Sequence, residues 1–148
     1  MTDHVLRMLG LARRGGNLAI GEDPVTEALK ERKAKVVFLA ADAAENTADR
    51  AARLTAGTNA MLLTLPYDKG QVGAGLGRES CAVLAVTDAG LAAAVVKKLA
   101  AEDGERYAEA ALQLEEKAQR TQRRKRAKAQ EKKQAQAGRK PGAASGKR

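Results

Sequence analysis

The sequence predicts an α/β domain in which helices cover both sides of a β-sheet. Short apolar runs alternate with segments of helical periodicity through the first two thirds of the chain. One run, residues 36–40, is apolar without interruption, as expected for a strand buried on both faces. The chain has 148 residues, which is room for one ordinary domain and a short extension.

The elements of this domain are expected in regular alternation. Gly15 and Gly16 end the first helix. Asp23 followed by Pro24 is typical of a helix start, with Asp23 as the N-cap and Pro24 as the first helical residue. Asn46 with Asp49 indicates the next helix start, and Asp88 a later one. Strands are expected at 18–20, 36–40, 61–63 and 81–86, separated by helices that include 5–12, 24–29, 47–56, 67–76 and 89–99.

The composition excludes most metal and disulfide chemistry. Cys81 is the one cysteine and His4 the one histidine, so no internal disulfide, multi-thiolate site or two-histidine zinc motif can form. Cys81 begins a predicted strand, where a structural thiol is expected. No catalytic set is apparent, and we expect a non-enzymatic protein without metal or cofactor. Neither a membrane-spanning run nor a secretory signal is apparent, which favours a cytoplasmic location.

The glycine-rich run of residues 73–77 invites a phosphate-loop interpretation. A dinucleotide loop, however, needs a strand, the spacing GxGxxG and then a helix start. These glycines fall in a short predicted helix and the loop after it. Close packing, with an RNA-approach loop, is the better interpretation. Asp42, just past a predicted strand, is expected to cap a loop.

The charge is distributed very unevenly. Residues 1–100 hold 13 Lys and Arg against 11 acids, and residues 101–116 hold one base against six acids. Residues 117–148 hold 13 bases against Glu131 alone. We therefore expect a domain over 1–100, a charged helical extension over 101–137 and a disordered basic tail over 138–148. A solvated helix face is the simplest explanation of a charge run, but this excess of bases would repel itself without a polyanion, which favours nucleic acid. It lacks the apolar face of a membrane-surface helix.

Basic and glycine-rich residues also mark the candidate binding site in the domain. Arg13 and Arg14 precede the first strand, and Gly21 precedes a helix whose free N–H groups can accept a phosphate. Arg32 and Lys33 stand between that helix and the next strand, together with Lys30 and Lys35.

Several motifs resemble the bacterial YlxQ-type proteins of the kink-turn RNA-binding superfamily of large-subunit ribosomal proteins. The motifs are Leu-Gly-Leu-Ala-Arg-Arg at 9–14, Gly-Glu-Asp at 21–23, Lys-Ala-Lys-Val-Val at 33–37, Ala-Asp-Ala-Ala-Glu-Asn-Thr at 41–47 and Gly-Arg-Glu at 77–79 leading to Ala-Val-Thr-Asp at 85–88. The resemblance runs over residues 5–99. It implies a three-layer α/β/α sandwich around a four-stranded mixed sheet.

The resemblance also implies that RNA docks on the loop and helix start at Gly21–Asp23, assisted by the loop at Gly77–Ser80. The candidate RNA-binding residues are Arg13, Arg14, Gly21, Glu22, Asp23, Glu27, Arg32, Lys33, Arg78, Glu79 and Ser80.

The chain departs from the kink-turn pattern at the second helix. Kink-turn binders carry Asn-Glu at its start and Lys one turn later, and these side chains read sheared G·A pairs and neutralise the backbone. Here the aligned residues are Asp23, Pro24 and Glu27. Asp23 only accepts hydrogen bonds, Pro24 has no polar side chain, and Glu27 has the wrong sign for a phosphate. The departure predicts weaker kink-turn readout than in those binders.

The sequence favours a non-enzymatic protein that binds ribosomal or other structured RNA, with the basic tail adding affinity that does not depend on sequence. Two alternatives are a nucleoid-like DNA binder and the RNA-recognition subunit of an RNA-modifying complex. A third is a protein-interaction adaptor that uses the acidic stretch and the apolar stripe of Tyr107, Ala111, Leu114 and Ala118.

Overall fold

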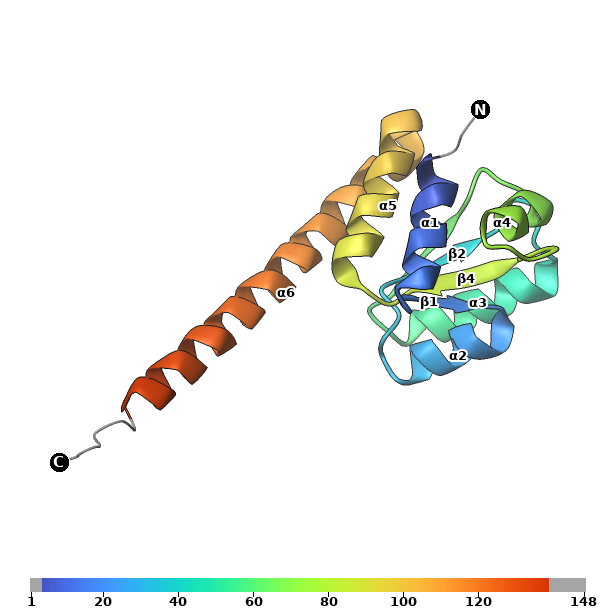
Figure 1. Cartoon of the computed structure of the whole chain (residues 1–148). Coiled ribbons are helices and arrows are strands. Elements are labelled where there is room, and N and C mark those ends of the chain that lie inside the picture. The colour runs from blue at the N-terminus through green and yellow to red at the C-terminus, as the bar shows by residue number, and fades with distance from the viewer. Residues whose placement is uncertain (1–3, 139–148) are drawn as a thin grey trace. The chain divides into compact units, whose positions relative to one another are not determined.

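The computed structural model describes residues 4–138, and the side chains of residues 4–132. It contains four strands and six helices in these residues, shown in Figure 1. The elements in chain order are α1 (His4–Arg14), β1 (Leu18–Ile20), α2 (Glu22–Lys30), β2 (Val36–Leu39), α3 (Glu45–Ala56), β3 (Met61–Thr64), α4 (Lys69–Gly75), β4 (Val83–Val86), α5 (Ala89–Glu102) and α6 (Gly104–Gly138). None of these helices is long and apolar enough to cross a membrane.

The four strands form one mixed sheet in the order β1-β4-β2-β3. β2 and β3 are parallel, and β4 runs antiparallel to both of its neighbours. Every residue of the central strands β2 and β4 is buried, whereas the edge strands β1 and β3 are half-buried. The uninterrupted apolar run at 36–40 therefore does mark a strand covered on both faces.

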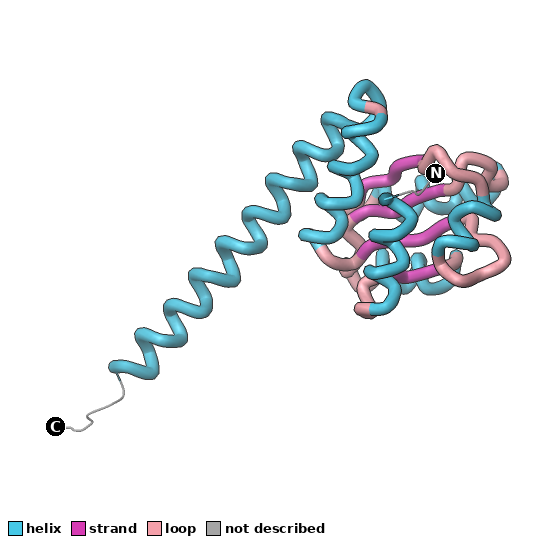
Figure 2. Tube along the Cα trace, turned by 45° about the horizontal axis from the view of Figure 1, so that its top comes forward, coloured by secondary structure: helices cyan, strands magenta, loops and turns pink. Residues whose placement is uncertain are grey.

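Helices cover both faces of the sheet, as Figures 1 and 2 show. Phe38 points to the side of α1, α4 and α5 and packs with Leu9 and Val96. Val37, its neighbour in β2, belongs to the opposite core, where it packs with Leu29 of α2. Because successive side chains of a strand alternate between faces, one apolar strand supplies both cores. The predicted three-layer α/β/α sandwich is confirmed.

The first compact unit extends further along the chain than expected. It covers Met1–Glu115, and a second unit covers Glu116–Arg148. Tyr107 and Leu114 of α6 are 2% exposed and belong to the same core as Leu9 and Phe38. The boundary expected near residue 100 is therefore too early, because the apolar stripe of α6 completes the core. Two of that stripe's side chains are consequently not free to bind an adaptor's partner.

The extension beyond residue 100 is helical, since α6 continues to Gly138. Its exposed side chains between residues 120 and 132 are mostly Lys, Arg and Gln, which favour helix but have nothing to bury. Disorder is expected for residues 138–148. Gly138 is instead the last residue of α6, and residues 139–148 lie outside the described part of the chain.

Two predicted helix starts differ from the structure. The N-cap of α2 is Gly21 rather than Asp23, so Glu22, Asp23 and Pro24 are its first three residues. The N-cap of α3 is Ala44, without a side-chain hydrogen bond, so Asn46 and Asp49 lie inside the helix. Neither start uses a side-chain cap, because Gly21 leaves β1 with a positive φ and Ala44 is an extended residue without a polar side chain. α4 starts with a capping box that the sequence analysis did not predict. The Asp68 side chain accepts from the Gln71 N–H, and the Gln71 side chain accepts from the Asp68 N–H.

Candidate nucleic-acid interface

Gly21 turns the chain directly from β1 into α2. Its φ of 98° is open to glycine and strained for other residues. The Gly21 N–H donates to the Val83 carbonyl at 3.0 Å, and the first helical bond runs from the Val25 N–H to the Gly21 carbonyl. Pro24 brings no N–H, so the helix start offers the N–H groups of Glu22 and Asp23. These two N–H groups have no carbonyl acceptor within the helix, because no helical turn precedes them. Such groups can bind an anion.

The loop of residues 77–80 is packed close to the same end of the sheet. A Cβ on Gly73 would lie 2.5 Å from the Ser80 Cα, so the α4 backbone and this loop touch directly. The Arg78 N–H donates to the Gly73 carbonyl at 2.7 Å, which holds the loop to the helix. Gly73 and Gly75 thus serve close packing, as expected, whereas Gly77 supplies a positive φ of 72°. The loop leads through Cys81 to Val83, whose carbonyl is bonded to Gly21, so the chain after the loop lies beside Gly21.

Arg13 joins these residues from α1. Its Nη1 lies 3.5 Å from the position that a Cβ on Gly77 would take. The structure therefore brings together part of the predicted site, which we call the Gly21 surface. It consists of Arg13, Gly21, Glu22, Asp23, Glu27, Arg78, Glu79 and Ser80.

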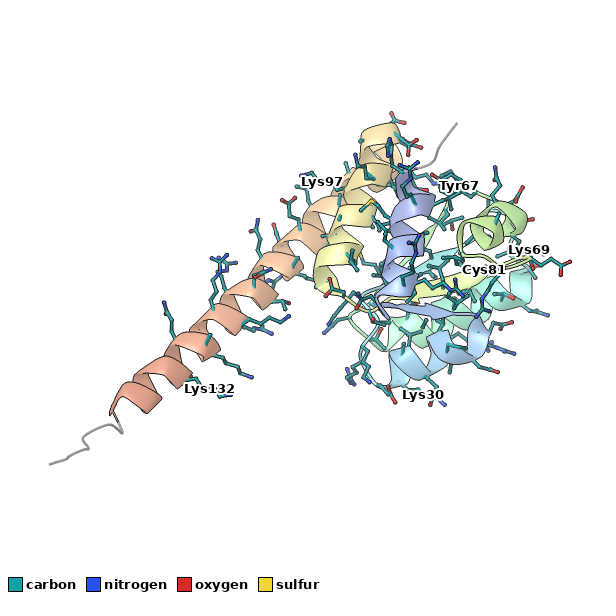
Figure 3. All side chains as sticks on the ribbon, in the orientation of Figure 1. Lys30, Tyr67, Lys69, Cys81, Lys97 and Lys132 are labelled. Atoms are coloured by element: carbon teal, nitrogen blue, oxygen red, sulfur yellow. The ribbon has the colours of Figure 1, made fainter. Side chains whose placement is uncertain are left out.

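Arg32 and Lys33 do not belong to the Gly21 surface, because they follow the other end of α2. The Lys35 N–H donates to the Val86 carbonyl, while Gly21 bonds Val83, at the other end of β4. Arg14 ends α1 three residues before Asn17, whose carbonyl accepts from the Thr87 N–H, also at the Val86 end. Figure 3 labels Lys30 at this end of α2 and Cys81 near the Gly21 end. The predicted site residues are thus divided between two ends of one short sheet.

The Gly21 surface carries a net negative charge, because it holds two arginines and four acids. Glu22, Asp23 and Glu27 are exposed, and Glu22 Oε1 accepts from Arg50 Nη1 at 3.0 Å. Sequence reasoning missed Arg50, which lies 28 residues away on α3 and shows its pairing with Glu22 only in the fold. Of the positions aligned with the kink-turn pattern, none carries a cation. A phosphate at this surface would depend on backbone N–H groups and on Arg13 and Arg78.

Two residues considered for chemistry are structural. The Asp42 Oδ1 accepts a hydrogen bond from the Lys69 N–H at 2.7 Å, which joins the loop after β2 to the start of α4. Cys81 is 5% exposed, and its Sγ donates to the Val83 carbonyl. Burial raises the pKa of the Cys81 thiol above its usual value, so it stays protonated at neutral pH. Among the described residues, no group of three or more potential ligands could hold a metal ion.

Together these features define a class of protein: an α/β/α sandwich whose second helix starts at a glycine turn beside the loop that leads into β4. Residues 3–96 match the Ribosomal protein L7Ae/L30e/S12e/Gadd45 family, and the chain belongs to that family. This confirms the resemblance seen in the motifs.

Individual relatives agree with this assignment. A protein named "RNA-binding protein YlxQ" from Bacillus subtilis (strain 168) is 35% identical over 96 residues, which cover 62% of this chain and 91% of that protein. A protein of the same name from Enterococcus faecium is 45% identical over 42 residues, or 28% of this chain and 41% of that protein. The solved structure of a protein of unknown function from Bacillus halodurans C matches with a TM-score of 0.61 and 24% identity. The match covers 66% of this chain and 97% of that chain, and it shows the same fold.

Proposed function

We propose that this chain is a non-enzymatic, cytoplasmic RNA-binding protein that contacts ribosomal or other structured RNA. The observation that carries the proposal is the Gly21 N–H bond to the Val83 carbonyl, because it joins the start of α2 to the segment that directly follows the loop of residues 77–80. These are the two segments on which the family resemblance implies RNA docking. The Bacillus subtilis and Enterococcus faecium relatives are both named as RNA-binding proteins.

The two parts of the chain contribute differently to binding. At the Gly21 surface, backbone N–H groups, Arg13 and Arg78 position the RNA, and the departures at Asp23, Pro24 and Glu27 weaken kink-turn readout. The basic half of α6 supplies affinity that does not depend on sequence, since its exposed Lys and Arg neutralise phosphates and release counterions.

The experiment compares the full chain with a variant that neutralises part of α6. Replacing Arg123, Arg124, Lys125 and Arg126 by Gln keeps a helix-favouring residue at each position. Each phosphate contact adds roughly 0.7 to 0.9 to the slope of log affinity against log salt. We expect weaker binding of a structured RNA hairpin and a clearly smaller slope.

Sequencing of RNA crosslinked to the full chain in cells identifies the target. Enrichment of ribosomal RNA is the expected result, and enrichment of other structured RNA would place the protein elsewhere among RNA binders. Tighter binding of duplex DNA than of any RNA would favour the nucleoid-like alternative. No crosslinked RNA and no hairpin binding would refute the proposal.

A further inference from the structure

The two ends of α2 carry opposite charge. Glu22, Asp23 and Glu27 occupy its first turns, whereas Lys30 ends the helix and Arg32, Lys33 and Lys35 follow it. Arg14, at the end of α1, lies at the same end of the sheet. Asn17, three residues after it, is bonded to Thr87, and Lys35 is bonded to the adjacent Val86. We call Arg14, Lys30, Arg32, Lys33 and Lys35 the basic surface.

Little on the basic surface offsets this charge. Arg14, Lys30, Arg32 and Lys33 are exposed and Lys35 is half-buried. Glu31 is the neighbouring acid, and it contacts Lys33 at 3.2 Å with both side chains more than half exposed. An ion pair that exposed is weak and leaves both groups available. Asp88 is engaged in capping α5 through the Leu91 N–H.

Arg32 adds an observation that helix electrostatics does not explain. The Arg32 N–H donates to the Leu29 carbonyl at 3.1 Å and the Lys33 N–H to the Ala28 carbonyl at 2.8 Å, which is a Schellman motif. Its left-handed position is usually glycine, but here Arg32 occupies it with φ 59°, the one non-glycine residue with positive φ in the described chain. Bases in the last turn stabilise a helix dipole, but a strained arginine beyond it lowers stability. A side chain kept at such a cost suggests a role in function.

We propose that the basic surface is a second RNA contact, which binds the phosphate backbone at the end of the domain opposite the Gly21 surface. This inference rests on the proposed function, and it locates the phosphate-binding charge of the folded domain. The residues of the Gly21 surface carry a net negative charge, with three of their four acids on α2, so RNA phosphates are attracted to the other end. One domain would then touch two segments of a folded RNA.

The experiment uses the full chain and a structured RNA hairpin, titrated over a range of salt. The test variant carries Lys30→Gln, Arg32→Gly and Lys33→Gln. The matched control carries Arg53→Gln, Lys97→Gln and Lys98→Gln, which remove the same charge from exposed positions on α3 and α5. We expect the test variant to lose about two or more units of the log–log salt slope and tenfold or more in affinity. The control should lose less than about one unit.

Substitutions at Arg32 distinguish an effect on RNA binding from an effect on stability. Arg32→Gly relieves the positive φ, so its melting temperature should rise or stay unchanged while its RNA affinity falls several-fold. Arg32→Lys keeps the charge and should bind nearly as tightly as the natural chain. Equal losses in the test and control triple variants would overturn the second contact and leave RNA binding intact. Full affinity in Arg32→Gly would also count against it, and absence of RNA binding by the natural chain would remove both proposals.

Discussion

The Tyr107 hydroxyl donates a hydrogen bond to the backbone carbonyl of Thr64, 43 residues earlier in the chain. Thr64 is the last residue of β3, an edge strand of the sheet. The ring of Tyr107 is 2% exposed and lies in the main core. The first turns of α6 are therefore part of the folded domain, although their sequence is acidic and was expected to lie outside it.

Substitution of Tyr107 should separate the ring from its hydroxyl. Tyr107→Ala should lower the free energy of unfolding by about 3–5 kcal/mol, as for other large aromatic residues removed from a core. Tyr107→Phe should cost about 0.5–1.5 kcal/mol, since it removes one hydrogen bond. Leu112→Ala, at a side chain that is 63% exposed, is the control and should change stability by less than about 0.5 kcal/mol. Urea unfolding measures all three, and equal stability of the Tyr107→Ala and Leu112→Ala variants would contradict the role of Tyr107.

Gly73→Ala should destabilise the domain by about 1–3 kcal/mol, because the new methyl group would meet the backbone of Ser80. Gly57→Ala is the matched control, since nothing lies within 4 Å of its Cβ position. We expect that control to be neutral or slightly stabilising. Thermal unfolding compares the two, and a neutral Gly73→Ala would mean that the loop of residues 77–80 can move away at no cost.

Brief trypsin digestion should leave a fragment that ends between Lys117 and Arg126. The bonds after Arg123 and Arg124 lie in exposed helix outside the first compact unit. The bond after Arg106 should resist cleavage, although that side chain is exposed, because Tyr107 holds the backbone in the core. Mass spectrometry identifies the fragment ends. A dominant product ending at Lys98 or Arg106 would return the boundary to residue 100.

Stability should fall above about pH 9. Burial raises the pKa of the Cys81 thiol from a reference of 9.0, and burial also raises the pKa of Tyr107 from a reference of 10.0. Groups whose pKa is raised in the folded state favour folding fully below the unfolded pKa, and that contribution is lost as the pH rises through the folded pKa. Urea midpoints between about pH 7 and pH 10 should decline less steeply for Cys81→Ala than for the natural chain. Identical pH profiles of the two proteins would show that the thiol takes no part.

The departure from the kink-turn pattern can be reversed in one variant. Asp23→Asn, Pro24→Glu and Glu27→Lys together supply a donor–acceptor amide, a carboxylate and a cation at exposed positions of α2. A well-placed base contact contributes about 1–3 kcal/mol, so affinity for a kink-turn RNA should rise roughly tenfold. Stability should change little, because the N-cap is Gly21 and is untouched.

Two RNAs at the same salt concentration decide what this gain means. One carries the kink-turn, and the other has its G·A pairs disrupted. A gain on both would be an effect of charge alone. No gain on either, with the fold intact, would indicate that the RNA meets the domain away from the Gly21 surface.

The sequence by itself determined the order of elements and the fold class. The apolar run at 36–40, the glycine pair at 15–16 and the Asp88 cap are local patterns whose meaning does not depend on distant residues. Its motifs also indicated the family. Local patterns failed at the start of α2, where the hydrogen bond between Gly21 and Val83 and the positive φ of Gly21 place the N-cap two residues before Asp23.

Only the tertiary structure decided which site residues meet. Arg13 reaches Gly77 across 64 positions of sequence, and Glu22 pairs with Arg50 of another helix. Glu22 begins α2 and Arg32 lies just past its end, so the helix places the two residues at opposite ends of the sheet. The boundary of the domain also depends on a distant contact, because the buried Tyr107 is bonded to Thr64, which ends β3, 43 residues earlier. Contacts between distant segments depend on how helices and strands pack, and composition along the chain does not encode that arrangement in any local pattern.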